Sequence, residues 1–412
     1  MSTSHKDREI LRELAKQVAE IAALPVQQET IRLWKAHNAR KPVRPMVMID
    51  QVCWHEMDVD HELTLRTGGA LSRHLETDLR RTLYAWRHMR ADMVVEPFLS
   101  IHKVVRNSGF GIQTVEERAV SDPNNSVVGH HYTDQLKTEA DLERIRIPEV
   151  SVDEAATARL EEQARAVFDG VIDVRMCGVG YPMLSPWDQI STWRSVEGAL
   201  YDLADRPEFM HQLMKRLMEA HTGQLDQFEK LGLLGNGPRI HCTGAYSDEL
   251  PAPGHDPKHL RAKDIWTFGQ AQMFSTVSPA MHEEFEIEYV IPWYQRFGLA
   301  YYGCCEPLDN KIGIIRRLPN VRKISMSPWV DIEKGASQIG RDFVFSRKPN
   351  PAFLAPDKWD PANVERDLCQ TRDTCRRHGC PLEFILKDIS TVHYQPQRLW
   401  EWAAIARRVV GA

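Results

Sequence analysis

The 412-residue sequence predicts an α/β protein in which parallel strands close into a (β/α)₈ TIM barrel behind an N-terminal helical extension. Beyond residue 43, short apolar segments typical of strands alternate with longer segments typical of helices. This alternation indicates parallel βα units with right-handed crossovers. About eight or nine such strands fit a closed barrel with insertions. An open doubly wound sheet is the alternative, disfavoured because no Gly-x-Gly-x-x-Gly loop follows any strand.

The N-terminal extension, residues 1–42, is expected to be helical. Apolar residues recur at helical spacing from residue 6 to residue 38, and Pro25 divides this segment into two helices. After this segment, the helical spacing gives way to short apolar runs typical of strands. Residues 43–412 are therefore assigned to the barrel domain.

The barrel elements follow from apolar periodicity and from the positions of Gly and Pro. The expected strands are the short apolar runs, in chain order 45–50, 93–99, 171–176, 238–243, 266–272, 298–303, 321–326, 342–346 and 382–387. The expected helices are 71–90, 152–168, 186–205, 207–231, 278–296, 308–318, 330–338, 361–378 and 396–409. Residues 100–135 are expected to form a hairpin-like insertion.

The composition disfavours several classes of protein. A net charge of −5 and a pI near 6.4 argue against a nucleic-acid-binding protein, which would need a basic stripe. No apolar stretch approaches the ~18 residues of a membrane span, and the charged N-terminus has no signal-peptide core. Eight cysteines without a dense regular spacing fit reduced thiols better than a disulfide framework. We therefore expect a soluble, cytoplasmic protein.

The segment with the strongest chemical signal runs from residue 301 to residue 307, where Cys304, Cys305 and Glu306 follow an apolar run. The end of a parallel strand faces the ligand crevice in such folds. Alternation along the strand would place Cys304 and Glu306 on one side and Cys305 on the other. A thiolate and a carboxylate on one side predict a Zn²⁺ site. The alternative is that both cysteines are small buried hydrophobic residues.

Other polar or aromatic residues lie near the ends of predicted strands. His241 is a candidate metal ligand or catalytic group, with a hydrogen-bonded core histidine as the alternative. Glu96 is a further candidate catalytic residue, because a carboxylate in an apolar strand is either paired or faces the pocket. Gln270 at a strand end is another candidate, with an amide that caps a helix as the alternative. Candidate substrate contacts near strand ends are Trp54, His55, His102 and Trp266.

From residue 43 onwards, the order of elements resembles that of the uroporphyrinogen decarboxylase superfamily. This superfamily includes zinc methyltransferases that supply methyl groups to corrinoid proteins. Three stretches carry the resemblance: the helical pair within 191–232, the Ile-Ser-Met-Ser and Lys-Pro-Asn-Pro motifs at 324–327 and 348–351, and the closing unit at 385–399. The resemblance implies a TIM barrel with its active site at the carboxyl ends of the strands.

Two comparisons with this family narrow the expected activity. Its decarboxylases carry an arginine-rich loop after the first strand, whereas residues 51–58 contain no arginine, so a porphyrinogen substrate is not expected. Its methyltransferases carry a His-x-Cys pair at a strand end and a third cysteine after the last strand. By position, Cys304-x-Glu306 takes the place of the pair, and Asp388 lies near the third ligand. The resemblance thus implies zinc held by Cys304, Glu306 and either Asp388 or His241.

The predicted function is a zinc-dependent methyltransferase of the demethylase type. It would move a methyl group from a small methoxy donor to a Co(I) corrinoid. One version of this hypothesis has an aromatic methoxy compound as the donor. The corrinoid (cobalamin) would come with a separate protein, because this chain has no Asp-x-His-x-x-Gly motif. A ligand set richer in oxygen suits an ether donor. A metal-independent decarboxylase of a small carboxylate and a non-catalytic ligand-binding barrel are the alternatives; the oligomeric state is open, with a homodimer possible.

Overall fold

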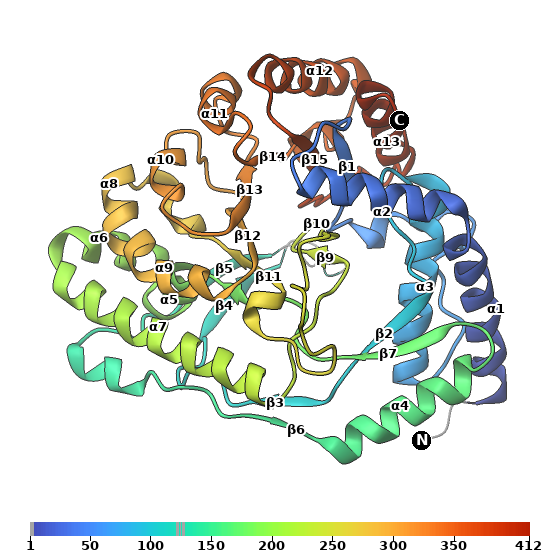
Figure 1. The fold of residues 1–412 in the computed structure, drawn as a ribbon, viewed down its shortest axis with the longest axis horizontal. Coiled ribbons are helices and arrows are strands. Elements are labelled where there is room, and N and C mark those ends of the chain that lie inside the picture. The colour runs from blue at the N-terminus through green and yellow to red at the C-terminus, as the bar shows by residue number, and fades with distance from the viewer. Residues whose placement is uncertain (1–3, 121–122, 124, 126–127) are drawn as a thin grey trace.

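The computed structural model describes residues 4–120, 123, 125 and 128–412. Its central element is a parallel sheet in the order β1-β15-β14-β13-β12-β11-β8 (Figure 1). The seven strands are β1 (Met46–Ile49), β8 (Met183–Leu184), β11 (Trp266–Gly269), β12 (Leu299–Tyr302), β13 (Val321–Met326), β14 (Val344–Arg347) and β15 (Leu382–Leu386). Strands β11 to β15 are buried at every position, as expected of a sheet covered on both faces. The predicted α/β class is confirmed, and closure into an eight-stranded barrel stays a prediction.

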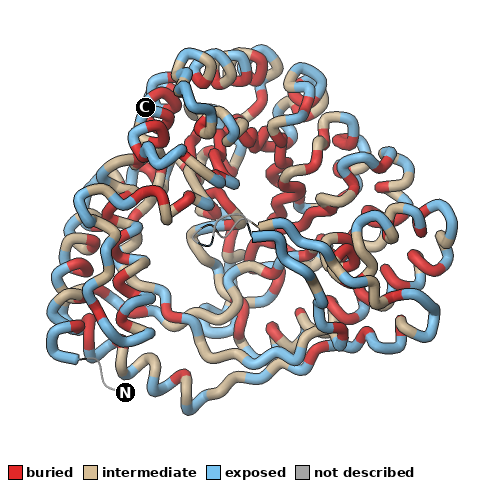
Figure 2. Tube along the Cα trace, turned by 180° about the vertical axis from the view of Figure 1, so that it is seen from behind, coloured by how far each residue is buried: buried red, intermediate tan, exposed pale blue. Residues whose placement is uncertain are grey.

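Helices surround this sheet, and their buried sides face it (Figures 1 and 2). The α-helices after the N-terminal extension are α3 (Ala70–His88), α4 (Glu154–Phe168), α5 (Pro186–Arg194), α6 (Val196–Asp205), α7 (Pro207–Lys230), α8 (Pro279–His282), α9 (Glu288–Arg296), α10 (Ile312–Ile315), α11 (Ile332–Ile339), α12 (Pro361–His378) and α13 (Gln397–Val410). Shorter 3₁₀ or π turns are η1 (Trp54–Glu56), η2 (Glu139–Arg144), η3 (Ala262–Asp264), η4 (Gln272–Thr276), η5 (Glu283–Ile287) and η6 (Pro351–Leu354). In the described part, no helix combines the length and hydropathy needed to cross a membrane.

The N-terminal extension forms two helices, α1 (His5–Ala22) and α2 (Pro25–Asn38), as predicted. Pro25 occupies the first turn of α2, where its missing N–H costs no helical hydrogen bond. Helix α2 contributes to the core beside the sheet, because Trp34 is buried in one cluster with Met46 and Met48 of β1 and Trp266 of β11. The Trp34 indole donates to the Asp92 carbonyl at 2.9 Å. The boundary at residue 42 stays a prediction.

Among the described residues, four short strand pairs lie outside this sheet. Strand β2 (Phe98–His102) pairs in parallel with β7 (Asp173–Cys177). The antiparallel pairs are β3 (Val105–Asn107) with β6 (Val150–Val152), β4 (Glu116–Ala119) with β5 (Gly129–Tyr132), and β9 (Arg239–Ile240) with β10 (Thr243–Gly244). The β4–β5 pair confirms the predicted hairpin-like insertion, part of whose connection lies outside the described residues.

Two predicted strands differ from the structure. The run at 93–99 becomes a strand only from Phe98, because Pro97 has no N–H to donate to a ladder. The run at 238–243 is not a parallel strand but the tight β9–β10 hairpin. At its turn His241 adopts a φ of 48°, which reverses the chain and ends the strand.

Two predicted helices are also shorter than expected. The 186–205 helix is divided at Ser195, whose φ of 62° is incompatible with a continuous helix. The 308–318 helix is reduced to α10. Apolar periodicity alone did not reveal either interruption.

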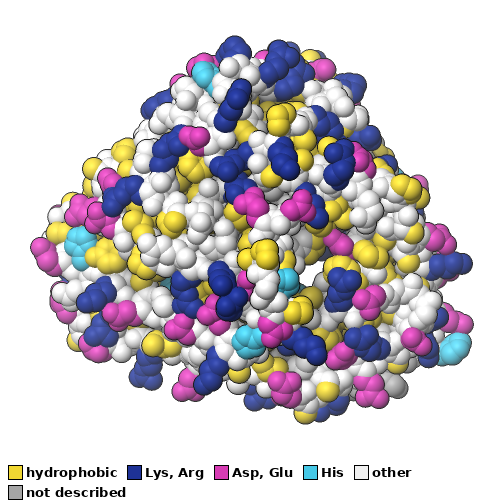
Figure 3. Space-filling view, viewed as in Figure 1, with side chains coloured by type: hydrophobic (Ala, Val, Ile, Leu, Met, Phe, Trp, Pro, Cys, Tyr) yellow, Lys and Arg dark blue, Asp and Glu magenta, His cyan; other side chains and the backbone are white. Residues whose placement is uncertain are grey.

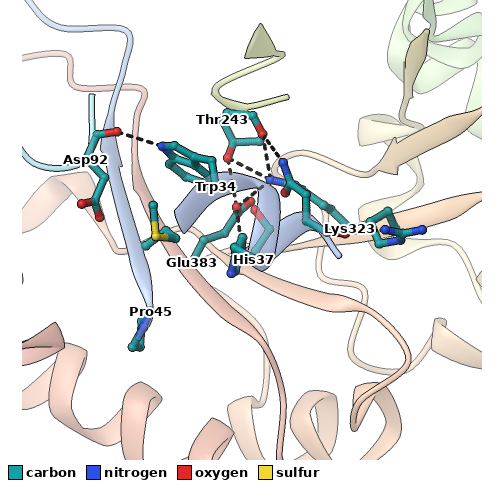
Figure 4. A network of polar contacts seen from close by, with 12 residues as sticks. Trp34, His37, Pro45, Asp92, Thr243, Lys323 and Glu383 are labelled. Atoms are coloured by element: carbon teal, nitrogen blue, oxygen red, sulfur yellow. Dashed lines mark hydrogen bonds and ion pairs between the residues drawn. The ribbon is translucent and has the colours of Figure 1, made fainter. Parts of the chain in front are cut away.

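A buried ion cluster joins α2 to the sheet and to the β9–β10 hairpin (Figure 4). The Lys323 ammonium donates to Oε2 of Glu383 at 2.7 Å, and His37 Nε2 lies 3.1 Å from the same oxygen. The Thr243 hydroxyl also donates to this oxygen at 3.0 Å. Burial opposes ionisation of Glu383, but Lys323 and His37 hold the pKa of its carboxyl well below the usual value. The cluster therefore fixes α2 by a hydrogen bond to a buried carboxylate as well as by packing.

His221 on α7 is expected to lower the stability of the fold at acid pH. Its ring is 8% exposed and packs on Phe110 with 4.5 Å between centroids. Burial lowers the pKa of His221 to about 4, whereas an unfolded histidine has a pKa of about 6.5. Between these values the unfolded state binds the extra proton, so stability falls as the pH falls from about 6.5 to 4, by about 3 kcal/mol from this residue.

We expect His221→Phe to flatten this part of the stability curve. Urea unfolding midpoints measured at several pH values, with the exposed His74→Phe as control, check this. An unchanged pH dependence in His221→Phe would contradict the assignment.

Candidate active site

The candidate site lies where β12 and β15 end, although β13 and β14 separate these strands in the sheet. Cys304 follows β12, and Lys387 directly follows β15. The Lys387 ammonium donates to Sγ of Cys304 at 2.9 Å. The sheet therefore curves enough to bring together side chains that are three strands apart.

His241 completes this group from the β9–β10 hairpin. Its Nε2 lies 3.5 Å from Cys304 Sγ and 3.3 Å from Lys387 Nζ. Its ring stacks on Phe268 of β11 with 4.1 Å between centroids. The reversed backbone at His241, which ends the predicted strand, is what aims this ring at the thiol. We call Cys304, His241 and Lys387 the thiol triad.

The thiol triad holds one negative and two positive charges. A hydrogen bond from Cys305 works against burial and, with His241 and Lys387, lowers the pKa of Cys304 to about 3. Burial opposes protonation of His241, but hydrogen bonds to the Cys242 and Cys304 thiols raise its pKa to about 9. Burial also opposes the charge of Lys387, yet the nearby thiolates raise its pKa. At neutral pH the triad is a buried thiolate held between two cations.

The solvent side of the triad is formed by Cys305 and Asp388. The two thiols lie 3.5 Å apart, and the Cys305 thiol donates to Asp388 Oδ2 at 3.5 Å. The contact with Cys304 raises the pKa of Cys305, so Cys305 is the neutral partner. The expectation that Cys304 and Cys305 point to opposite sides is wrong, because β12 ends at Tyr302 and both cysteines lie in the following turn.

Glu306 has a structural task in this turn. Its carboxylate accepts from the Cys304 N–H at 2.9 Å and from the Ala271 N–H at 3.3 Å. It therefore points to the backbone of two strand ends and does not share a side with the Cys304 thiol, contrary to expectation. Gly303, with a φ of 87°, makes the turn possible, since a Cβ there would lie 2.3 Å from Leu308.

Gln270 belongs to a second buried polar group beside Glu306. Its amide donates to Asp188 Oδ2 at 2.6 Å. Burial and the neighbouring Glu306 raise the pKa of Asp188 to about 7. The predicted catalytic role of Gln270 remains a prediction; in the structure it positions Asp188.

Glu96 lines a separate cavity of about 370 Å³ between β1, β2 and α3, in which Trp54 is also a wall residue. The Tyr246 hydroxyl donates to Glu96 Oε1. The guanidinium of Arg81 lies 5.0 Å from the Trp54 ring centroid. The structure thus brings together one predicted catalytic residue and one predicted substrate contact.

The other predicted substrate contacts are dispersed. His55 packs edge-on to Tyr394, 6.4 Å between centroids. His102 is exposed, with its Nδ1 3.3 Å from the Gly178 carbonyl. Trp266 is a core residue whose indole donates to the Ala245 carbonyl at 3.0 Å.

The predicted zinc ligands do not form a ready metal site. Within the described ranges, no group of three or more His, Cys, Asp and Glu side chains is arranged to hold a metal ion. The Lys387 ammonium lies closer to both Cys304 Sγ and His241 Nε2 than these atoms lie to each other. A zinc ion between the two would have to displace this ammonium. The residues as placed do not fit zinc.

The sequence reasoning missed Lys387 and Tyr246 as site residues. Lys387 had a signal, because it directly follows an otherwise apolar strand and buried lysines are rare unless paired. Cys242 adjoins the predicted His241, and the Cys242 pKa is lowered by Lys348 and His241 against burial. Tyr246 carried no signal, since only the fold brings it to Glu96.

No protein-family model and no curated protein matches the sequence. Among solved structures, one described as a methyltransferase from Methanosarcina mazei is similar, with a TM-score of 0.54 and 12% sequence identity. The similarity covers 92% of this chain and 98% of that chain. At this identity the likeness shows a shared fold. Membership of the decarboxylase superfamily stays a prediction.

Proposed function

We propose that this chain is a methyltransferase that moves a methyl group from a small methoxy compound to the Co(I) corrinoid of a separate partner protein. The observation that carries the proposal is the thiol triad, a buried thiolate between two cations at the carboxyl ends of β12 and β15. Strand ends of this kind form the reactive face in comparable α/β folds. The fold shared with a methyltransferase supports the same class of reaction.

The chemical problem is to remove an alkoxide or phenoxide from carbon. The Co(I) acceptor supplies the electron pair of the new carbon–cobalt bond, and the donor oxygen keeps the pair of the broken C–O bond. Developing negative charge on this oxygen is stabilised by fixed positive charge nearby. His241, the less buried cation of the triad, supplies a proton, so the products are a methylated corrinoid and an alcohol or phenol.

Lys387 and Cys304 serve this step as partners of His241. The thiolate keeps the imidazole protonated up to a pH of about 9, and the ammonium balances the thiolate when His241 gives up its proton. No part of this scheme passes through a metal, because the residues do not fit one. The predicted zinc dependence stays a separate hypothesis.

The test is conversion of reduced corrinoid proteins by the purified chain in the presence of methoxy donors. We expect the Co(I) absorption spectrum to change to that of methyl-Co(III), with release of the matching alcohol or phenol. Several corrinoid proteins are needed, because docking is partner-specific. Failure with every methoxy, methylamine and methylthio donor would contradict the proposal and direct the assay to carbon dioxide release from small carboxylates.

Metal analysis separates two forms of the proposal. Activity that survives chelation, in protein without bound metal, supports the lysine-based scheme. Activity lost on chelation and restored by zinc supports the zinc hypothesis and contradicts the lysine-based scheme.

A further inference from the structure

We propose that the cavity between β1, β2 and α3 binds the aromatic ring of the methyl donor, and that Glu96 recognises a phenolic hydroxyl on that ring. Figure 3 shows the surface hollowed between the β9–β10 hairpin and the β2–β7 pair, where this cavity lies. Its volume of about 370 Å³ falls in the range of small-molecule sites. The inference deepens the proposed function by naming a donor class.

The walls of the cavity favour a flat apolar ligand. Trp34 and Trp54 contribute indole rings, and Phe98 contributes a phenyl ring. Three thioethers complete this lining: Met48, Met89 and Met93. Aromatic and methionine side chains together give large, adaptable contact area for a ring.

Most charged side chains that line the cavity already have a partner in the protein. Arg81 lies over the Trp54 ring, and Arg90 lies over the Trp86 ring. Asp50 is paired with Arg239 at 3.2 Å, and Asp92 with Arg44 at 2.6 Å. Glu96 differs, because its Oε1 accepts from the Tyr246 hydroxyl while its Oε2 has no protein partner in the described part of the chain. An ionised carboxylate oxygen accepts hydrogen bonds and donates none. Glu96 thus has one oxygen free to accept a hydrogen bond from a ligand hydroxyl, and its charge disfavours a ligand carboxylate at this position.

The ends of β1 and β15 connect the cavity with the strand end that carries Lys387. The Asp50 N–H donates to the Leu386 carbonyl at 2.9 Å, and the Ile389 N–H donates to the Gln51 carbonyl at 3.2 Å. Asp50 and Gln51 line the cavity, and these two hydrogen bonds bracket Lys387 and Asp388. We place the methoxy group of a ring held by Glu96 at this end of the cavity, towards Lys387, which favours a methoxyphenol.

The test is equilibrium binding of 2-methoxyphenol to the full chain by calorimetry, without corrinoid. We expect one site per chain, with weaker binding of 1,2-dimethoxybenzene, which lacks the hydroxyl, and no binding of 2-methoxybenzoate or tetramethylammonium. Glu96→Gln should weaken binding of 2-methoxyphenol about tenfold or more, because a hydrogen bond to a charged acceptor is lost. Ala85→Phe, which fills the cavity from α3, should abolish binding, and the exposed Glu333→Gln serves as the matched control.

The outcomes separate this site from the reaction. Binding with the expected variant effects but without methyl transfer supports the site and contradicts the proposed function. Absence of binding at millimolar concentration, or binding unchanged in both Glu96→Gln and Ala85→Phe, overturns the site. Preference for tetramethylammonium would also overturn it in favour of a cationic donor.

Discussion

Replacing Cys304 with alanine is expected to lower the rate of methyl transfer by about 100-fold or more, the scale on which preorganised charge contributes to catalysis. The variant leaves His241 and Lys387 as neighbouring cations without their shared thiolate. His241 then loses its proton more easily, so less imidazolium is present to protonate the leaving oxygen. The rate of methyl-Co(III) formation under single-turnover conditions measures the effect.

Three variants make this result specific to the thiolate. Cys304→Ser keeps the size of the side chain but not its charge, so its rate should resemble that of Cys304→Ala. Cys305→Ala removes one hydrogen bond to the thiolate and should lower the rate only about tenfold. Cys375→Ala, a buried cysteine on α12, controls for cysteine loss. A Cys304→Ala rate close to the wild-type rate would contradict the role of the triad.

Replacing Glu383 with glutamine is expected to destabilise the protein by about 3–5 kcal/mol, the usual cost of removing one partner from a buried ion pair. Lys323 and Glu383 are fully buried, and His37 is 1% exposed. Without the carboxylate, two bases remain that burial drives towards their neutral forms. The shift of the urea unfolding midpoint, followed by circular dichroism, measures the loss.

A paired variant tests whether the cost comes from the uncompensated charge. Lys323→Met combined with Glu383→Gln should recover much of the stability lost by Glu383→Gln alone. Glu333→Gln, which removes an exposed ion pair with Arg377, should change stability by less than about 1 kcal/mol. If Glu383→Gln unfolds at the wild-type midpoint, the cluster in Figure 4 does not hold α2 in place.

The triad and the ion cluster show how charged residues occupy the inside of this sheet. Lys323 and Glu383 lie within strands β13 and β15, and Lys387 directly follows β15. Each cation has an anionic partner within hydrogen-bond distance, a carboxylate for Lys323 and a thiolate for Lys387. The chain thus carries its own positive charge at the place where the predicted zinc would sit.

The residue pattern determined the α/β class, the two N-terminal helices and most of the parallel strands. These features depend on local periodicity and on the positions of Pro and Gly. Because these signals act over a few residues, they can be recognised from short segments of the sequence. It also drew attention to Cys304 and His241, because both follow apolar runs.

The tertiary structure decided which polar groups meet. Strand alternation paired Cys304 with Glu306, but the turn after Tyr302 instead joins Cys304 to Cys305 and turns Glu306 to the backbone. Lys387 meets Cys304 only because the sheet curves across β13 and β14, and Tyr246 meets Glu96 only through the hairpin. Contacts between residues far apart in sequence depend on sheet curvature and on single reversed residues such as His241, and no local period encodes either.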